Sequence, residues 1–265
     1  MKRKLGQFIF LLCLGLLLSA FWWAPKLVDY VENLDFNNQE ININNETAVN
    51  EPFNQYTSRS VVYVLVNHTS VELGTRKTSQ GSGVVVDVDQ EHFYVLTNFH
   101  LIDTDGGYSI DSVKVVDYLN NNYYAEIIIT NQLEEIASET YDLALLKVPR
   151  IDTEINEAFK SRLQLTPGMI VHSIGYPGNE RTFTSGKYLQ LENSYGIPFQ
   201  LISHDSYINK GSSGGALLDK NGDLLGINVR VLNDSTSDQF VKGYAIPLEK
   251  INEYLKMFNI TMEVK

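Results

Sequence analysis

The sequence predicts an all-β protein with about twelve short strands. Runs of β-branched and aromatic residues recur along the chain, and turn residues separate them. Short strands at this spacing are typical of a β-barrel or a β-sandwich. The length of 265 residues is enough for one large or two small domains. The clearest runs are residues 61–66, 83–88, 93–97, 113–118, 123–130, 143–148, 169–174, 216–218, 224–229 and 243–246.

A helix is predicted after the last of these strands. Pro247 is a favourable residue for the first turn of a helix. The apolar residues that follow it recur at helical spacing, so they share one face. We expect this helix to pack on the second half of the β-structure through Leu248, Ile251, Leu255 and Phe258.

The first 26 residues have the pattern of a membrane anchor or a signal peptide. Three cationic residues at positions 2–4 precede an apolar run, 8–24, in which Ser19 is the only polar side chain. The run is just long enough to span a bilayer, and Trp22 and Trp23 suit the membrane interface. We expect an uncleaved transmembrane helix with a cytoplasmic basic flank. Cleavage after Ala20, which would give a secreted protein, is the alternative.

Residues 27–58 predict a flexible stalk between this anchor and a domain at 59–265. Eight asparagines alternate there with acidic residues and few large apolar groups. Such a segment cannot bury enough apolar surface to offset the entropy lost on ordering.

Charge and cysteine content limit the possible functions. Residues 27–265 carry 17 cationic and 32 anionic side chains, a formal charge of −15, which argues against nucleic acid as a partner. Cys13 is the only cysteine and lies in the apolar run, so the domain has no disulfide. The sequence contains no metal-ligand cluster and no phosphate-binding glycine loop, so we expect no cofactor.

Three short stretches suggest a nucleophilic triad of His100, Asp142 and Ser213. His100 follows a predicted strand in a Thr-Asn-Phe-His sequence, and Ser213 lies in a Gly-Ser-Ser-Gly-Gly turn. In a triad the serine attacks, the histidine takes its proton, and the aspartate orients and stabilises the imidazole. Asp142 opens an apolar strand, where an acid is costly unless it is paired. Its rivals Asp103, Asp105 and Asp111 lie in polar, loop-like surroundings.

The glycines around Ser213 predict an oxyanion hole made by the backbone N–H groups of Gly211 and Ser213. A Gly-x-Ser-x-Gly sequence also fits the nucleophile elbow of α/β-hydrolases. That fold needs a histidine after the serine, and no histidine follows Ser213. The order His, Asp, Ser is that of the chymotrypsin-like double β-barrel.

Seven sequence blocks in order, over roughly residues 59–258, resemble HtrA-type (DegP-like) trypsin-like serine proteases. Two of the blocks are the stretches around His100 and Asp142. The other five are 81–85, the pair 173–178 and 184–186, 204–215, 222–228 and 243–247. The resemblance implies two six-stranded β-barrels and a serine endopeptidase acting on exported or unfolded proteins. It also implies a possible homotrimer and an extracytoplasmic domain at a bacterial cell membrane. Only seven residues follow Phe258, so we expect no PDZ domain.

The substrate-binding residues are expected on two segments near the serine. Trypsin-like pockets have Asp six residues before the nucleophile, but this chain has Tyr207, so cleavage after Lys or Arg is not supported. The mainly apolar lining predicts a preference for aliphatic side chains. The expected pocket walls are Tyr207, Ile208 and Asn209 on one side and Ile227, Asn228 and Val229 on the other.

Two other functions remain open at this point. The first is a catalytically weak protein of protease fold that binds peptides, and the second is a cytosolic esterase. The second would require the N-terminal apolar run to lie outside a membrane.

Overall fold

The computed structural model describes residues 59–262 with the exception of 105, 130, 131, 152, 156 and 195. The predicted anchor at 1–26 and stalk at 27–58 lie outside the described residues. Within the described part, no helix is long and apolar enough to cross a membrane.

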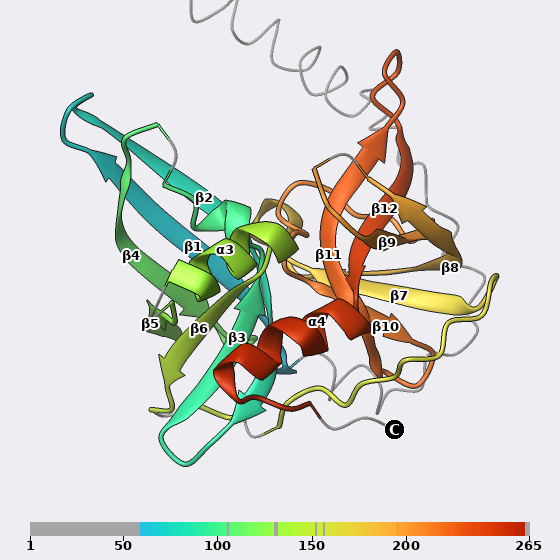
Figure 1. The fold of residues 1–265 in the computed structure, drawn as a ribbon, viewed down its shortest axis with the longest axis horizontal. Coiled ribbons are helices and arrows are strands. Elements are labelled where there is room, and N and C mark those ends of the chain that lie inside the picture. Colours follow the sequence, from blue (N-terminus) through green and yellow to red (C-terminus); the bar gives the residue numbers. More distant parts are fainter. Residues whose placement is uncertain are drawn as a thin grey trace, which may run out of the picture. The chain divides into compact units, whose positions relative to one another are not determined.

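The first half of the domain is a closed six-stranded antiparallel barrel (Figure 1). Its strands follow the order β1-β2-β3-β6-β5-β4. Alternate valines of the first strand, Val62, Val64 and Val66, point into the barrel with Phe93 and Val95, as expected for period-two patterning. The strands are β1 (Val61–Ser70), β2 (Thr75–Val88), β3 (His92–Thr97), β4 (Ser109–Val116), β5 (Asn122–Ile127) and β6 (Ala144–Pro149).

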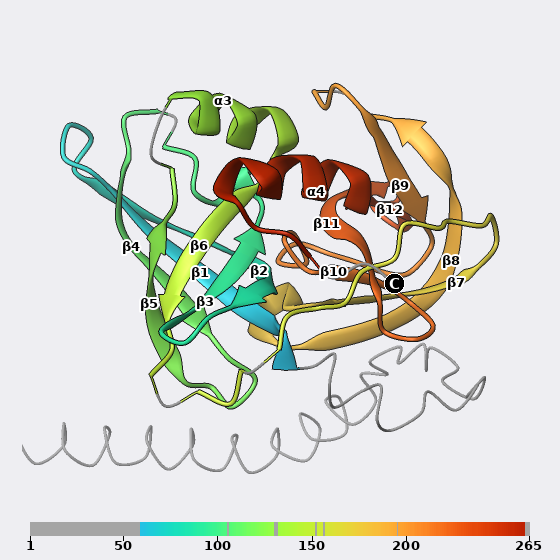
Figure 2. The same cartoon turned by 60° about the horizontal axis from the view of Figure 1, so that its bottom comes forward.

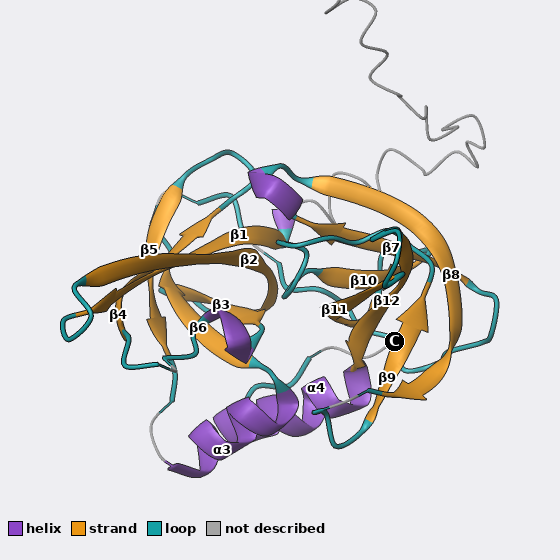
Figure 3. Cartoon of the chain, turned by 90° about the horizontal axis from the view of Figure 1, so that it is seen from above, coloured by secondary structure: helices purple, strands orange, loops and turns teal. Residues whose placement is uncertain are grey.

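The second half is another closed six-stranded barrel, in the order β10-β11-β12-β9-β8-β7 (Figure 3). The prediction of twelve strands in two barrels is therefore confirmed. The strands are β7 (Ile170–Gly175), β8 (Thr182–Asn193), β9 (Gln200–His204), β10 (Ala216–Asp219), β11 (Leu224–Asn233) and β12 (Phe240–Pro247).

The predicted C-terminal helix is present as α4 (Leu248–Leu255), continued by the short 3₁₀ helix η3 (Lys256–Phe258). Ile251 and Leu255 are fully buried. They belong to an apolar cluster that also contains Leu143 of the first half and Ile246 of the second. The helix therefore helps to join the two barrels, and Figure 2 shows it running across the domain beside a second helix, α3.

The sequence prediction missed α3 (Gln132–Tyr141) and the full extent of several strands. The run predicted at 123–130 ends as a strand at Ile127, and α3 follows before β6. Strands β8 and β9 were not among the ten runs: Tyr188 is the only buried residue of β8, and β9 is only five residues long. Hydrophobic patterning is weak in a strand that has so little buried surface.

Candidate active site

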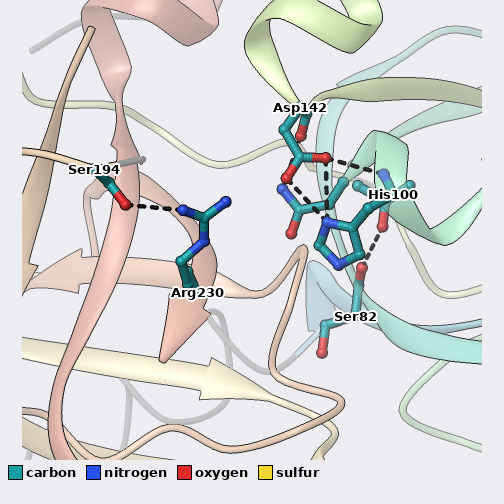
Figure 4. A network of polar contacts seen from close by, with 7 residues as sticks. Ser82, His100, Asp142, Ser194 and Arg230 are labelled. Atoms are coloured by element: carbon teal, nitrogen blue, oxygen red, sulfur yellow. Dashed lines mark hydrogen bonds and ion pairs between the residues drawn. The ribbon is translucent and has the colours of Figure 1, made fainter. Parts of the chain in front are cut away.

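His100 and Asp142 form a closely contacting pair on the first barrel (Figure 4). His100 lies in the 3₁₀ helix η1 (Phe99–Leu101) directly after β3. Its Nδ1 atom is 2.9 Å from Oδ2 of Asp142 and 3.1 Å from Oδ1, and its backbone N–H donates to Oδ1 at 2.9 Å. One carboxylate thus fixes both the ring and the backbone of the histidine. The rival Asp111 instead accepts a hydrogen bond from Thr69.

The helix that the sequence did not predict explains the position of Asp142. Asp142 has a left-handed backbone conformation with φ +51°. Its N–H donates to the carbonyl of Glu139 at 3.2 Å, and the N–H of Leu143 donates to that of Ser138 at 3.1 Å. These two bonds are those of a Schellman motif, in which the left-handed residue ends a helix. The end of α3 therefore turns the chain so that the Asp142 carboxylate meets His100.

Asn98 connects the same two segments. Its side-chain Nδ2 donates to the backbone carbonyl of Asp142 at 2.9 Å. Asn98 is fully buried, so this bond links the end of β3 to the start of β6 away from solvent. The Thr-Asn-Phe-His stretch therefore holds the aspartate as well as the histidine.

The Gly211–Gly215 loop carries Ser213 on the second barrel, between β9 and β10. The N–H groups of Ser212, Gly214 and Gly215 donate to the carbonyls of Asn209, Asn228 and Ser212 at 2.8 to 2.9 Å. The N–H groups of Gly211 and Ser213 have no acceptor among the residues that the structure describes. Those two groups are the donors that the sequence predicted for an oxyanion hole.

Glycine is required at position 211 by both conformation and space. Its φ is +98°, and a Cβ atom there would lie 2.6 Å from the carbonyl oxygen of Tyr176. A side chain would therefore change the direction of the Gly211 N–H.

Ser82 connects this loop to the first barrel. Its N–H donates to the Ser213 carbonyl at 2.7 Å. Its hydroxyl donates to the Gly211 carbonyl at 2.7 Å and accepts from the Tyr176 N–H at 2.8 Å. Its carbonyl accepts from the hydroxyl of Thr97 at 2.7 Å. The sequence analysis used Gly81-Ser82-Gly83 only as a mark of resemblance and did not identify this role.

Ser213 and His100 come from different barrels, and within the described ranges no hydrogen bond joins the Ser213 hydroxyl to the imidazole. Catalytic hydrogen bonds are often long before substrate binds. The side chain of His100 is 43% exposed and that of Asp142 is 14% exposed, so the imidazole is accessible from solvent.

The residues predicted to contact substrate differ in exposure. Tyr207 is 44% exposed and packs edge-on against Phe240, with 5.1 Å between the ring centroids. Its hydroxyl accepts a hydrogen bond from Asn209. The other four, Ile208, Ile227, Asn228 and Val229, are buried.

A buried histidine, His204, lies beside one of these residues, Ile208. The sequence analysis had no partner pattern for this histidine. His204 ends β9 opposite Gly243 of β12, and a Cβ on Gly243 would lie 2.7 Å from Nε2 of His204 and 2.8 Å from Cδ1 of Ile208. Burial lowers the pKa of His204 to about 4. A position nine residues before the nucleophile gave no sequence signal for this contact.

Arg230 is a second residue near the site that the sequence analysis did not consider. It lies on β11, two residues after Asn228, and its guanidinium donates to the Ser194 hydroxyl at 2.9 Å (Figure 4).

No group of three or more His, Cys, Asp or Glu side chains in the described part of the chain could hold a metal ion.

Comparison with known proteins identifies the same fold and family. The trypsin-like peptidase domain matches residues 81–227. A probable periplasmic serine protease of the Do/HhoA type from Haemophilus influenzae is 33% identical over 172 residues, which are 63% of this chain and 34% of that protein. The periplasmic serine endoprotease DegP of Escherichia coli is also 33% identical over 172 residues, 63% of this chain and 33% of DegP.

Solved structures agree with these sequence relatives. The HtrA-type protease AlgW, solved with a tripeptide, is 25% identical with a TM-score of 0.62, covering 78% of this chain and 62% of AlgW. The Rv3671c protease of Mycobacterium tuberculosis, in its active form, shares the fold at 22% identity and a TM-score of 0.61, covering 82% of this chain and 88% of that one.

The chain spans about a third to a half of the length of the curated relatives that it matches. The expected resemblance to HtrA-type serine proteases is confirmed by the names of these relatives. Because the peptidase-domain match covers more than half of the sequence, the chain belongs to the trypsin-like peptidase family.

Proposed function

We propose that the protein is a serine endopeptidase in which His100, Asp142 and Ser213 form the catalytic triad. The observation that carries this proposal is the pairing of His100 with Asp142 in a chain whose Ser213 loop leaves two N–H groups without acceptors among the described residues. The family match and the serine endoproteases among the relatives support the same activity.

The proposed reaction follows from these positions. The Ser213 hydroxyl attacks the scissile carbonyl carbon while His100 accepts its proton, and Asp142 stabilises the imidazolium that forms. The Gly211 and Ser213 N–H groups donate to the oxyanion. His100 then gives its proton to the leaving amine as the peptide bond breaks. Water, activated by His100, hydrolyses the acyl-enzyme and releases Ser213.

The substrates are proposed to be exported or unfolded proteins. Relatives named periplasmic endoproteases support an extracytoplasmic site of action. In this proposal residues 1–26 anchor the protein in a bacterial membrane, residues 27–58 act as a stalk, and the peptidase domain comprises 59–265. A homotrimer remains part of the proposal because the resemblance implies it.

A fluorophosphonate probe tests the catalytic proposal, since it reacts only with an activated serine. We expect wild-type protein to be labelled and to cleave unfolded casein. Ser213→Ala should abolish both signals without affecting the fold, and His100→Ala should lower the rate by roughly 10⁴ or more. Ser206→Ala is a suitable control that should keep both signals. The hydroxyl of this buried serine contacts Thr184 and not the Gly211–Gly215 loop.

The absence of a hydrogen bond between Ser213 and His100 in the described structure favours a second candidate, a peptide-binding protein with little catalysis. Unlabelled wild-type protein that still binds unfolded casein would support this candidate. Turnover by Ser213→Ala at the wild-type rate would contradict the role of Ser213 in either case.

Attachment to the membrane is tested separately by fractionation. We expect the full-length protein in the membrane fraction after carbonate extraction, and an active fragment after mild proteolysis within 27–58. A soluble form that starts near Phe21 would instead show that the apolar run is a cleaved signal peptide.

A further inference from the structure

Strand β11 carries an exposed cation, Arg230, close to the loop that holds Ser213. Asn228 bonds this loop, since its N–H donates to the Gly215 carbonyl and its C=O accepts from the Gly214 N–H, both at 2.8 Å. After Asn228, β12 is the only strand among the described residues that pairs with β11. One edge of β11 is therefore open from the Ser213 loop onward, and Arg230 lies on this open stretch.

An open strand edge next to the nucleophile indicates where the substrate lies. Extended peptides bind such edges through main-chain hydrogen bonds, and the side chains around the edge then determine which sequences fit. In the proposed reaction His100 protonates the leaving amine, so the residues after the scissile bond lie toward the first barrel. The residues before that bond therefore lie along β11. Because Arg230 is two residues beyond the contact of β11 with the Ser213 loop, it is nearest to substrate residues two to four positions before the bond.

Arg230 is positioned by a segment that also touches the first barrel. Its guanidinium donates to the hydroxyl of Ser194, which follows β8 directly. Phe199, at the other end of the segment between β8 and β9, has its ring 5.6 Å from that of Tyr141, the residue before Asp142. In the view of Figure 4 the guanidinium lies between Ser194 and Asp142. The segment that positions Arg230 thus contacts the segment that holds the triad aspartate.

Two other charged residues near Arg230 neutralise each other. Tyr244 of β12 lies opposite Arg230, so the two side chains share one face of the sheet. The Tyr244 hydroxyl donates to Glu192, and Lys242 Nζ lies 2.6 Å from the same carboxylate. Neither Glu192 nor Lys242 is exposed, whereas Arg230 is. Arg230 is therefore the cation that this face presents to an incoming peptide.

A guanidinium selects its partner by charge and by shape. It is planar, carries five N–H donors and binds a carboxylate through two parallel hydrogen bonds. The bond to a serine hydroxyl orients the group and leaves its charge in place. A cationic side chain would be repelled, and a neutral amide would form weaker bonds. Residues 27–265 have a formal charge of −15, so a cation beside the triad also offsets the repulsion that an acidic peptide would meet.

We propose that Arg230 is a specificity-determining residue that binds a glutamate or aspartate side chain two to four residues before the scissile bond. This inference rests on the proposed endopeptidase function and names a substrate class for it. It concerns substrate positions ahead of the residue at the scissile bond, so the aliphatic preference expected at that residue is a separate prediction.

The test uses the full chain and peptides built around a bond that it cleaves in unfolded casein. The peptides carry Glu or Gln at one of the positions two, three or four residues before this bond. Glu and Gln are nearly equal in size, so the comparison isolates the charge. At the most responsive position we expect kcat/KM for the Glu peptide to exceed that for the Gln peptide about five- to tenfold. The difference should lie mainly in KM, because the contact is remote from the reacting atoms.

Substitutions of Arg230 test whether this residue is the source of the preference. Arg230→Gln should reduce the Glu-to-Gln ratio to about one, and Arg230→Glu should make Lys the preferred residue at the same position. Lys220→Gln is the matched control. Lys220 is another exposed cation of the second barrel, but it lies in the turn before β11 starts. This control should keep the wild-type ratio.

Equal kcat/KM values for Glu and Gln at all three positions in the wild type would overturn this inference and leave the endopeptidase function intact. That result does not depend on whether any variant folds. A folded Arg230→Gln protein with the wild-type ratio would also overturn it, as would an equal loss of the ratio in Lys220→Gln. If unfolded casein is not cleaved at all, the proposed function itself fails.

Discussion

The two barrels contribute polar groups of different kinds to the candidate site. On the first barrel, the His100 ring and backbone both contact the Asp142 carboxylate, whose own backbone is held by Asn98. On the second barrel, the N–H groups of Gly211 and Ser213 have no acceptor among the described residues.

The difference indicates a division of labour. The first barrel holds the candidate acid–base pair by contacts within the protein. The second presents two N–H donors that a bound oxyanion can satisfy. In this interpretation the first barrel supports proton transfer, and the second binds the oxyanion. The following variants test this contrast and the contacts that join the two barrels.

The largest effect is expected from Asp142→Asn on the first barrel. Asparagine has the same size and tolerates the left-handed conformation found at Asp142, so the fold should be kept. The neutral amide permits the wrong imidazole tautomer, and kcat should fall about 10⁴-fold. Steady-state kinetics on a peptide substrate provide the measurement. Asp111→Asn is the control, and an Asp142→Asn enzyme with wild-type kcat would require another acid in the triad.

Ser82→Ala tests the connection between the barrels. Without the hydroxyl, the Gly211 carbonyl and the Tyr176 N–H lose their shared partner, and the loop that presents the oxyanion donors is less well fixed. We expect kcat to fall by about 10- to 100-fold, less than on outright loss of an oxyanion donor, while KM changes little.

Ser203→Ala is the matched control for this experiment. Ser203 is also a fully buried serine with two partners, the Gln190 carbonyl and the Glu192 carboxylate. Both variants should lose stability through unpaired buried groups. Only Ser82→Ala should lower kcat, and equal kinetics in the two variants would argue against a positioning role.

The contrast between the barrels also explains what the sequence could predict. Ten of the twelve strands were recoverable because runs of β-branched and aromatic residues mark them, as in β1. His100, Asp142 and Ser213 stood out because their flanking residues are distinctive. The contacts of Ser82 and His204 could not be predicted, since their partners Gly211 and Gly243 are 129 and 39 positions away and only the closed barrels bring them together.

Asp142 shows a different limit. The sequence identified the residue from the apolar strand after it, but not the Schellman motif that orients it. Helix α3 was missed because its sequence is rich in Glu, Ser and Thr, and Ala137 is the only buried apolar residue among its described side chains. Its Ser138 and Tyr141 form hydrogen bonds with α4 instead. The helix is therefore held by contacts with another helix and not by an apolar face that the sequence would show.

Acid should destabilise the second barrel through His204. Its folded pKa of about 4 lies below the ordinary value of 6.5, so the unfolded chain binds a proton more readily as the pH falls below 6.5. Stability is therefore complete above pH 6.5 and declines as the pH falls toward 4. The contribution lost at pH 5 is about 2 kcal/mol.

Urea unfolding at pH 7 and pH 5 measures this contribution. The pH-dependent loss should be smaller in His204→Leu than in the wild type by roughly that amount. His68 and His172 also have pKa values lowered mainly by burial, so part of the loss remains in the variant. An identical loss in both proteins would show that His204 is not buried in its neutral form.

The smallest effect is expected from Tyr254→Phe, which removes one contact between α4 and α3. Tyr254 is fully buried, burial raises its pKa to about 12, and its hydroxyl lies 2.9 Å from that of Ser138. Ser138 keeps its hydrogen bond to the Glu134 carbonyl in the variant, so the loss of stability should be only about 1 kcal/mol. Urea unfolding measures this change, and Tyr141→Phe, which removes a partly exposed contact with Glu253, should lose less stability.

The same Tyr254→Phe variant should change catalysis little. Because the Schellman motif at Asp142 is made within its own segment, kcat should stay within about threefold of the wild type, a change of under 1 kcal/mol. A tenfold fall in kcat at unchanged stability would instead show that α4, across the boundary between the barrels, sets the position of the Asp142 carboxylate.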